Sequence, residues 1–415
     1  MQHACNYGGD PGALGCWHRE AGGLGLSGWP GGGAAKAVVN WFEAAESRGA
    51  EPGGVHLDTS ATTAEQTNRN DGFIRQVGEW NRGGRMNAAF RWWCQDAVAC
   101  GAREVWAWFF GGVGACWTLM QFIRDIYAAR GTGGRPVISF EFFPPKTAEG
   151  DRNLLEKTIP ALLRTKPGFC SVTYGAGGST RDKTLMIVDR IHGQHGLTAV
   201  AHLTCVCATK EQIRDLLAQI GQLGLKNVLA LRGDPPGGGE FQATPGGFEF
   251  SSQLVRFIRE QGNFSIGVAG FPEGHIACKE GKYADWTHLK EKIDAGADYV
   301  LTQLFFDNAD FHQFRDHMTR KLGVSVPIVP GVVSILSGTQ IKRFTAMCGA
   351  TIPAPLAAKL DELGDDDEAV GEFGIEYATR QCEELLRAGV PGIHFYTLNK
   401  AHATVRILKN LGLAE

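Results

Sequence analysis

Short apolar runs rich in β-branched residues alternate with longer amphipathic stretches over the last two thirds of the chain. Each run has the length of a strand, and each stretch carries apolar residues at the three- and four-residue spacing of a helix. Eight strands are predicted, at 137–143, 169–174, 198–205, 227–231, 265–271, 299–306, 327–333 and 393–398. Helices are predicted between and after them, at 184–192, 211–223, 253–260, 289–295, 309–322, 340–348, 374–388 and 403–411.

This alternation predicts an α/β fold with a parallel sheet, because right-handed crossovers join each strand to the next. Eight repeats over about 280 residues match the size of a closed (β/α)8 TIM barrel. An open, doubly wound sheet is the alternative architecture. It is disfavoured because no predicted strand is followed by the GxGxxG sequence of a dinucleotide-binding crevice.

Residues 1–119 have a different composition. Nine of the ten tryptophans lie there, Lys36 is the only lysine, and glycine clusters recur. Helical or strand periodicity is sparse outside 36–46 and 90–102, and the features of a secretory or transit peptide are missing. We predict an atypical, poorly ordered Gly/Trp-rich extension at 1–119, followed by the barrel domain at 120–415. An over-extended gene start ahead of Met120 explains the same composition, and the sequence leaves both explanations open.

Charge and cysteine usage narrow the class of protein. The net charge of −3, with acidic and basic residues interspersed, indicates no nucleic-acid partner, and no apolar run reaches membrane-spanning length. Eleven scattered cysteines are typical of free thiols in a reducing compartment, so a cytoplasmic location is expected. No metal site is expected. Cys205 and Cys207 lack further ligands at metal spacing, and the carboxylates at 365–367 are better explained as a helix start.

One carboxylate occupies an unusual place in the first predicted strand. In the sequence VISFEFFPPK, at 137–146, Glu141 lies within an apolar run that two prolines terminate. We expect neighbouring phenylalanines to desolvate this carboxyl and raise its pKa, which suits a proton donor near neutral pH. A structural glutamate paired with an Arg or Lys is the alternative.

Chemistry-bearing residues follow most of the predicted strands, at the ends that form the catalytic face of a barrel. The sequences at these ends are TYGAGGSTR at 173–181, HLTC at 202–205, RGDPP at 232–236, FPEGH at 271–275, TQLFFD at 302–307 and HFYTLNK at 394–400. Glycine turns alone would not require so many titratable groups on one rim.

Together with VISFEFFPPK, these blocks resemble the methylenetetrahydrofolate reductase family, in the family's order, from about residue 124 to 413. The resemblance implies an FAD-containing barrel that takes hydride from NADH or NADPH and passes it to 5,10-methylenetetrahydrofolate, giving 5-methyltetrahydrofolate for methionine synthesis. It also implies transient nicotinamide binding against the flavin, small-molecule substrates and a homo-oligomer. Larger relatives carry a regulatory domain after the barrel, and none is expected here.

The resemblance also implies residue roles. Glu141 matches the acid that protonates the folate amine, and Asp234 matches an aspartate beside flavin and pterin. The positions implied to bind FAD are Thr173, Tyr174, Ala176, His202, Arg232, Gly233, Asp234, Ser251, Phe271, His275, Asp285, His288 and Lys292. The positions implied to bind substrate are Gln303, Gln340, Phe344 and Lys400.

Some of these positions depart from the family pattern or have simpler explanations. Phe271 stands where Tyr is frequent, so a hydroxyl that could form a hydrogen bond is missing there. Lys400 stands where many relatives have Arg, so the bidentate pairing of a guanidinium with a carboxylate is lost. Asp234 could be a turn residue, His275 a core or turn histidine, and Phe344 a core residue spaced with Ile341 and Met347.

Two classes of function therefore follow from the sequence. The first is a flavin-dependent reductase of one-carbon folate metabolism, which the presence of Glu141, Asp234 and Gln303 favours. The second is a folate- or flavin-binding barrel without turnover, acting in regulation or assembly. The choice between NADH and NADPH is left open.

Overall fold

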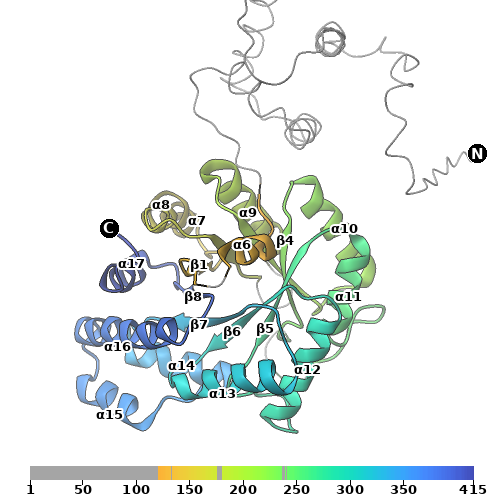
Figure 1. The fold of residues 1–415 in the computed structure, drawn as a ribbon. Coiled ribbons are helices and arrows are strands. Elements are labelled where there is room, and N and C mark those ends of the chain that lie inside the picture. Colours follow the sequence, from red (N-terminus) through yellow and green to blue (C-terminus); the bar gives the residue numbers. More distant parts are fainter. Residues whose placement is uncertain (1–119, 132, 175–179, 236–238, 240) are drawn as a thin grey trace, which may run out of the picture. The chain divides into compact units, whose positions relative to one another are not determined.

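A computed structural model of the chain describes residues 120–131, 133–174, 180–235, 239 and 241–415. Within these ranges eight parallel strands form one closed barrel, in which each strand pairs with the next and β8 pairs with β1 (Figure 1). The strands are β1 Val137–Phe142, β2 Phe169–Val172, β3 Ala199–Thr204, β4 Asn227–Leu231, β5 Ser265–Gly270, β6 Tyr299–Leu304, β7 Ile328–Val333 and β8 Gly392–Tyr396. The predicted (β/α)8 barrel is confirmed, and the open sheet is wrong. The predicted extension at 1–119 lies outside the described residues.

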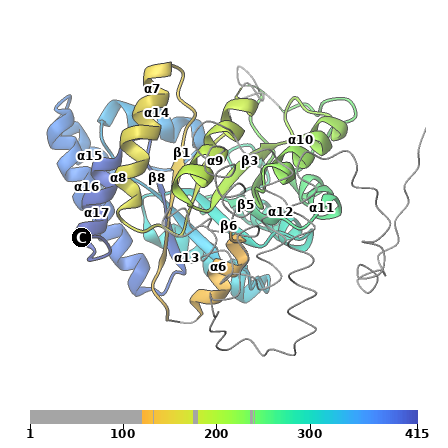
Figure 2. The ribbon, with the colours of Figure 1, turned by 90° about the horizontal axis from the view of Figure 1, so that it is seen from above.

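Helices surround the barrel, as both ribbon views show (Figures 1 and 2). They include α9 Arg181–His195, α10 Lys210–Gln222, α11 Ser251–Gln261, α12 Lys282–Asp294, α13 Asn308–Asp316 with η4 His317–Lys321, α14 Gly338–Cys348, α16 Asp367–Arg387 and α17 Ala401–Asn410. Each predicted helix exists, although α12 and α16 begin seven residues earlier than predicted because their first turns are polar or contain glycine.

Three helical segments lie outside the predicted helices. One joins β1 to β2 as α7 Ala148–Arg152, η2 Asn153–Thr158 and α8 Ile159–Leu163. The others are α15 Ala354–Leu363 and α6 Ile123–Arg130, which precedes β1. The first consists of short, irregular pieces interrupted by Pro160, so its apolar period is hard to recognise. At the start of α16, Asp366 accepts hydrogen bonds from the backbone of Glu368 and Ala369, which confirms the helix-start interpretation of the acidic run.

Side chains of β1 alternate between the two sides of the sheet. Phe140 and Phe142 are fully buried in the outer core between the strands and the surrounding helices. Val137 belongs instead to the core inside the barrel. Ser139 and Glu141 are two and four residues further along β1, so their side chains lie on the same, inner side of the sheet. The inner core contains Val137, Phe169, Val200, Leu229, Tyr299, Leu301 and Val329.

Helix α6, Ile123–Arg130, closes the amino-terminal end of the barrel (Figures 1 and 2). Its Ile123 and Tyr127 pack into the inner core, and the Ile123 amide donates to Asn227 Oδ1 at 3.0 Å. The adjacent Arg124 donates to the Phe264 carbonyl at 2.7 Å. Residues 120–130 are therefore an integral part of the barrel.

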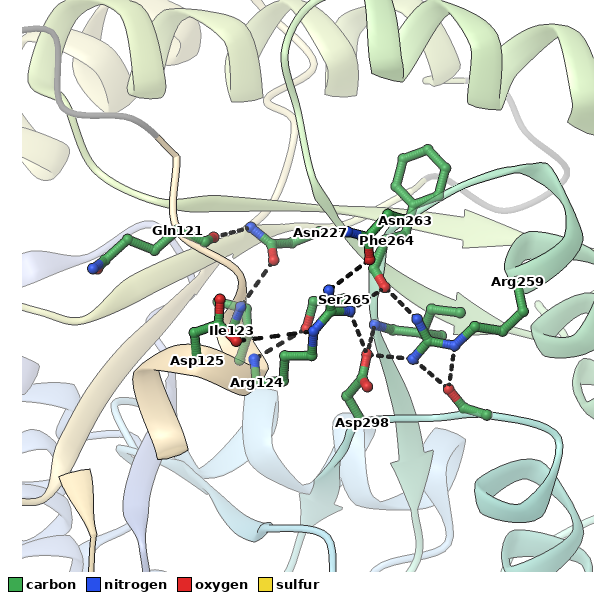
Figure 3. Close-up of polar contacts among 12 residues, drawn as sticks. Gln121, Ile123, Arg124, Asp125, Asn227, Arg259, Asn263, Phe264, Ser265 and Asp298 are labelled. Atoms are coloured by element: carbon green, nitrogen blue, oxygen red, sulfur yellow. Dashed lines mark hydrogen bonds and ion pairs between the residues drawn. The ribbon is translucent and has the colours of Figure 1, made fainter. Parts of the chain in front are cut away.

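Charged groups at this closed end are matched to partners (Figure 3). Asp298 Oδ2 lies 2.5 Å from Arg259 Nη2 and 3.6 Å from Arg124 Nη1, and it also accepts from the Ile266 amide at 2.7 Å. Arg259 donates further to the carbonyl of Gly296. The network links α6, α11 and the starts of β5 and β6.

Candidate active site

Glu141 lies inside the barrel near the carboxyl end of β1, where its side chain is 8% exposed. His202 Nε2, from β3, is 3.3 Å from Glu141 Oε2, and His394 Nε2, from β8, is 3.5 Å from the same oxygen. Ser171, from β2, donates a hydrogen bond to this oxygen at 3.3 Å. Three neighbouring strands thus place polar groups around one carboxylate.

The expected rise in the Glu141 pKa is wrong. Burial does raise the pKa of this carboxyl, but the adjacent imidazoles of His202 and His394 outweigh burial and lower it from 4.5 to about 2. The expected apolar wall is also wrong, because strand alternation turns Phe140 and Phe142 outward to the helices. The alternative pairing with Arg or Lys does not occur either, since the partners are imidazoles.

His394 and Ser139 extend this group, and neither was predicted as a site residue. Ser139 Oγ lies 2.8 Å from His394 Nδ1, and the two residues are register partners across β1 and β8. We name the set Ser139, Glu141, Ser171, His202 and His394 the carboxylate–imidazole group. His394 could have been identified from the side of the sheet that its side chain occupies in β8. That side is known only once β8 is paired in register with β1, and the sequence does not show this pairing.

A second group of charges gathers at the ends of β4 and β5 and on α12. Burial lowers the pKa of the Lys292 ammonium, although Asp285 opposes this. Burial raises the pKa of the Asp285 carboxyl, which Lys292 and His275 oppose. Burial also lowers the pKa of His275, and Arg232 adds to that effect. Because these groups influence one another's pKa, Arg232, His275, Asp285 and Lys292 lie near one another, and we name them the cationic cluster.

Gly233, after β4, approaches its neighbours too closely for any side chain. Its φ is +82°, and an added Cβ would lie 2.6 Å from Val206 Cγ1 and 2.9 Å from Thr204 Cβ. The neighbouring Arg232 guanidinium stacks 4.9 Å from the Phe241 ring centroid. Asp234 is exposed at this turn, and its charge raises the pKa of His275. The RGD turn therefore has a constrained backbone that presents two opposite charges.

Phe271 and Gln303 line one small, open hollow between the ends of β5 and β6 and the end of α14. The Phe271 ring packs edge-on against His275 with centroids 4.5 Å apart, so the hollow adjoins the cationic cluster. Phe344 is partly buried in a neighbouring apolar cluster with Ile341. Met347 is 69% exposed, so it does not complete the core stripe that was the alternative explanation of Phe344.

The other predicted positions are placed less closely together. Tyr174 Oη accepts from Arg181 Nε at 2.6 Å, and the Thr173 amide donates to the Phe142 carbonyl at 2.9 Å, so both lie at the barrel rim. Ser251 is buried at the start of α11, and His288 is exposed on α12. Gln340 lies on α14, and the exposed Lys400 precedes α17. Ala176 lies outside the described residues.

Two buried hydroxyl groups at the same rim lack hydrogen-bond partners within the described residues. They are Thr204 Oγ1, at the end of β3, and Ser334 Oγ, after β7. Buried polar atoms are ordinarily paired, so these hydroxyls are suited to contact a bound molecule. Cys205 is buried and Cys207 exposed, both with free thiols, and no group of three metal-ligating side chains occurs in the described part of the chain.

The barrel and its rim define a TIM-barrel protein with a buried acid against two histidines and a cluster of charged side chains at the ends of β4 and β5. The family profile described as methylenetetrahydrofolate reductase matches residues 126–412. The chain therefore belongs to the methylenetetrahydrofolate reductase family.

Relatives of two kinds support this assignment. Methylenetetrahydrofolate reductase (NADH) 1 of Zea mays is 41% identical over 307 residues, which cover 71% of this chain and 51% of the maize protein. The 5,10-methylenetetrahydrofolate reductase of Escherichia coli K12 is 39% identical over 281 residues, covering 68% and 92%. The chain thus spans about half the length of the plant relatives and nearly all of the bacterial one.

A solved structure shares the fold. An uncharacterized protein from Clostridium thermocellum, described as binding two copies of 5-methyl-5,6,7,8-tetrahydrofolic acid, matches with a TM-score of 0.50 at 14% identity, over 70% of this chain and 98% of that one. At this identity the likeness shows the fold alone. In the described ranges, no helix combines the length and apolar character needed to cross a membrane.

Proposed function

We propose that the protein reduces 5,10-methylenetetrahydrofolate to 5-methyltetrahydrofolate, with FAD as its cofactor and NADH or NADPH as the hydride donor, and so supplies methyl groups for methionine synthesis. The observation that carries this proposal is the buried Glu141 carboxylate held among His202, His394 and Ser171 at the carboxyl end of a barrel. Family membership supplies the reaction class.

The rim of the barrel fits FAD. Arg232, His275 and Lys292 supply cationic or donor groups suited to a diphosphate, and Asp285 balances their charge. Gly233 lets the turn that carries Arg232 and Asp234 pack closely on Val206 and Thr204, because a Cβ has no room there. Thr204 and Ser334 offer unpaired hydroxyls. When bound, FAD supplies the hydride relay between nicotinamide and folate.

Glu141 is proposed to deliver a proton to the folate amine so that the methylene bridge can open. The lowered pKa means that the carboxyl of the free protein is ionised near neutral pH. His202 Nε2 lies 3.3 Å and His394 Nε2 lies 3.5 Å from Glu141 Oε2, so either imidazole can exchange a proton with this carboxylate. Glu141 can therefore pass on a proton that His202 or His394 returns to it, in place of holding one itself.

Other residues are proposed to orient the substrates. Gln303 has an amide donor and acceptor beside the hollow lined by Phe271, which suits a pterin edge. Asp234 is proposed to lie beside flavin and pterin. Gln340 and Phe344, both on α14, and Lys400 are proposed to contact the rest of the folate or the nicotinamide.

The enzyme is favoured over an inactive binding barrel by the carboxylate–imidazole group. An acid in contact with two imidazoles provides a route for a proton, which a reduction with proton delivery requires and binding alone does not. The proposed assembly is a homo-oligomer in the cytoplasm. NADH and NADPH both remain candidate donors, and the maize relative's name includes NADH.

The test of this proposal starts with the absorption of the purified full chain, since bound oxidised flavin absorbs at about 450 nm. Steady-state oxidation of NADH and NADPH is then measured with menadione or methylenetetrahydrofolate as acceptor. Flavin-dependent turnover with the folate is expected. Bound flavin with menadione turnover and no folate reduction would contradict the folate reaction, and a colourless protein that FAD fails to reconstitute would contradict the flavoprotein assignment.

Kinetics test whether one site serves both substrates in turn. Nicotinamide and folate are both proposed to use the space near Gln303 and Phe344, so they cannot bind together. Parallel double-reciprocal lines are therefore expected when both concentrations are varied. Intersecting lines, which show a ternary complex, would exclude the shared site.

A further inference from the structure

The turn that follows β8 has an uncommon backbone. Leu398 has φ of 50° and Asn399 has φ of 59°, two consecutive residues other than glycine in the left-handed region. This conformation costs roughly 1 kcal/mol or more for each such residue, so surrounding contacts must maintain it. Leu398 supplies one such contact by packing against the apolar cluster that includes Val333 and Ile335. This unfavourable backbone conformation directly follows β8, the strand that pairs with β1 and Glu141.

Asn399 uses its side chain to hold the end of β1. Its Oδ1 accepts from the Phe143 amide at 2.9 Å, and its Nδ2 donates to the Phe143 carbonyl at 2.7 Å. The β1–β8 register ends at Glu141 and Tyr396, two residues before Phe143. Pro144 and Pro145 follow Phe143 and have no amide hydrogen to donate. The side-chain amide of Asn399 thus forms the two hydrogen bonds to Phe143 that the backbone of a longer β8 would have formed.

Thr397 connects the same turn to Glu141 itself. Its Oγ1 donates to the Glu141 carbonyl at 2.7 Å and accepts from the Asn399 amide at 3.2 Å. The Thr397 side chain is buried, with 3% of the residue exposed. The turn itself is held by Thr158 of η2, which donates to the Asn399 carbonyl at 3.1 Å. The backbone from the Glu141 carbonyl to Phe143 is therefore held by one turn.

We propose that Thr397 and Asn399 are positioning residues that hold Glu141 in place for proton delivery to the substrate. The Glu141 carboxyl must stay within reach of His202 at 3.3 Å and His394 at 3.5 Å while its other face meets a ligand. A backbone shift at 141–143 would change all of these distances together. This inference rests on the proposed role of Glu141 as the proton donor.

The substitutions that test it are Asn399→Ala, which removes both side-chain bonds, and Asn399→Asp, which keeps the acceptor and loses the donor to the Phe143 carbonyl. Thr397→Val removes the hydroxyl at nearly constant volume, and Thr397→Ser restores it. Asn410→Ala is the matched control, because Asn410 is an exposed asparagine of the following helix whose side chain bonds only Thr379.

The two half-reactions are measured separately by rapid mixing on the full-length holoenzyme. Reoxidation of the reduced flavin by methylenetetrahydrofolate is expected to fall ~10- to 100-fold in Asn399→Ala and Thr397→Val, since misplacement by about 1 Å can cost on the order of 10²-fold. Flavin reduction by the nicotinamide is expected to stay within about twofold of wild type, because no proton from Glu141 is needed there. Thr397→Ser should recover most of the rate.

Two further readouts separate positioning from general stabilisation. The pH profile of the folate half-reaction should shift in Asn399→Ala, because the carboxyl moves relative to two imidazoles. In the protein without substrates, exchange of the Phe143 amide hydrogen should accelerate, while amides of β5 should stay protected.

The outcomes that overturn the proposal are equally definite. Equal losses in both half-reactions, with an unshifted pH profile, would make the turn purely structural, and unchanged rates would make it irrelevant. If Asn399→Ala does not fold, the pair Thr397→Val and Thr397→Ser decides by the same criteria. If the wild type lacks the folate half-reaction altogether, the proposed function is refuted. If the wild type reduces folate and the variants do so equally well, only the positioning role is refuted.

Discussion

The two ends of the barrel arrange their charged and titratable groups in different ways. At the amino-terminal end, Asp298 pairs with Arg124 and Arg259, and all three also bond to the surrounding backbone (Figure 3). At the carboxyl end, His202 and His394 both lie against one oxygen of the buried Glu141. Buried hydroxyls without partners among the described residues occur at both ends, at Tyr127 and Tyr299 and at Thr204 and Ser334.

The difference follows from what each end must do. Matched charges cost little and link elements that are distant in sequence, so they stabilise the fold. Clustered, buried titratable groups are unfavourable in the free protein, and binding of a ligand or a proton offsets that free energy. We therefore expect substitutions at the two ends to separate activity from stability.

The largest effect is expected at Glu141. Glu141→Gln keeps the size and polarity of the side chain but cannot donate the proton, so folate-dependent flavin reoxidation should fall by ~10²- to 10⁴-fold, while flavin reduction persists. Rapid-mixing measurements of each half-reaction check this. Glu376→Gln, at an exposed ion pair with Arg380, is the control and should change neither rate. Parallel losses in both half-reactions would mean that Glu141 is structural.

The second largest effect is expected from acid, which should lower the free energy of unfolding through Glu141. The folded pKa of Glu141 is about 2, against 4.5 in the unfolded chain, so the folded state binds fewer protons between these values. The stability that Glu141 contributes is thus present above pH 4.5 and is lost as the pH falls towards 2. At most this contribution is on the order of 3 kcal/mol.

Urea unfolding of the wild type and of Glu141→Gln across this pH range measures the contribution. The free energy of unfolding of the wild type should fall more steeply with acidification than that of the variant. Identical pH slopes would show that the two imidazoles do not stabilise the ionised carboxylate.

A smaller, purely structural effect is expected at the closed end. Asp298→Ala leaves Arg259, Arg124 and the Ile266 amide without their shared acceptor, so the free energy of unfolding should fall by about 2 kcal/mol. The ratio of the two half-reaction rates should not change. Asp294→Ala removes only an exposed pair with Lys290 and should cost less than about 0.5 kcal/mol. A changed ratio in Asp298→Ala would show that the two ends are coupled.

The smallest effect is expected from removing residues 1–119. All eight strands, α6 and the described site residues lie within 120–415, so the shortened chain should keep its flavin content and reductase rate. The comparison is made on the two proteins expressed and purified in parallel. An insoluble or flavin-free short form would show that the first segment is a necessary structural domain.

Most of the fold could be predicted because strand and helix periods are local. The eight strands were located to within two residues at each end, and the closed barrel follows from their number and order. The segment 148–163 was missed because its helical turns are short and irregular, and the starts of α12 and α16 were missed because polar first turns carry no apolar period.

Within the candidate site, Glu141, His202, Arg232, His275 and Lys292 could be selected from the strand ends and the family resemblance. His394, Ser139, Thr397 and Asn399 could not be assigned roles, because their partners are about 250 residues away in sequence.

The order of residues along the chain is enough to predict the strands, the strand ends that carry chemistry and the family resemblance. The protonation state of Glu141 depends on the fold. A carboxyl among phenylalanines in the sequence became a carboxyl among histidines in the barrel, because side chains on one strand alternate between its two faces while the neighbours on each face come from other strands. The direction of its pKa shift follows from those neighbours, and a linear sequence does not contain them.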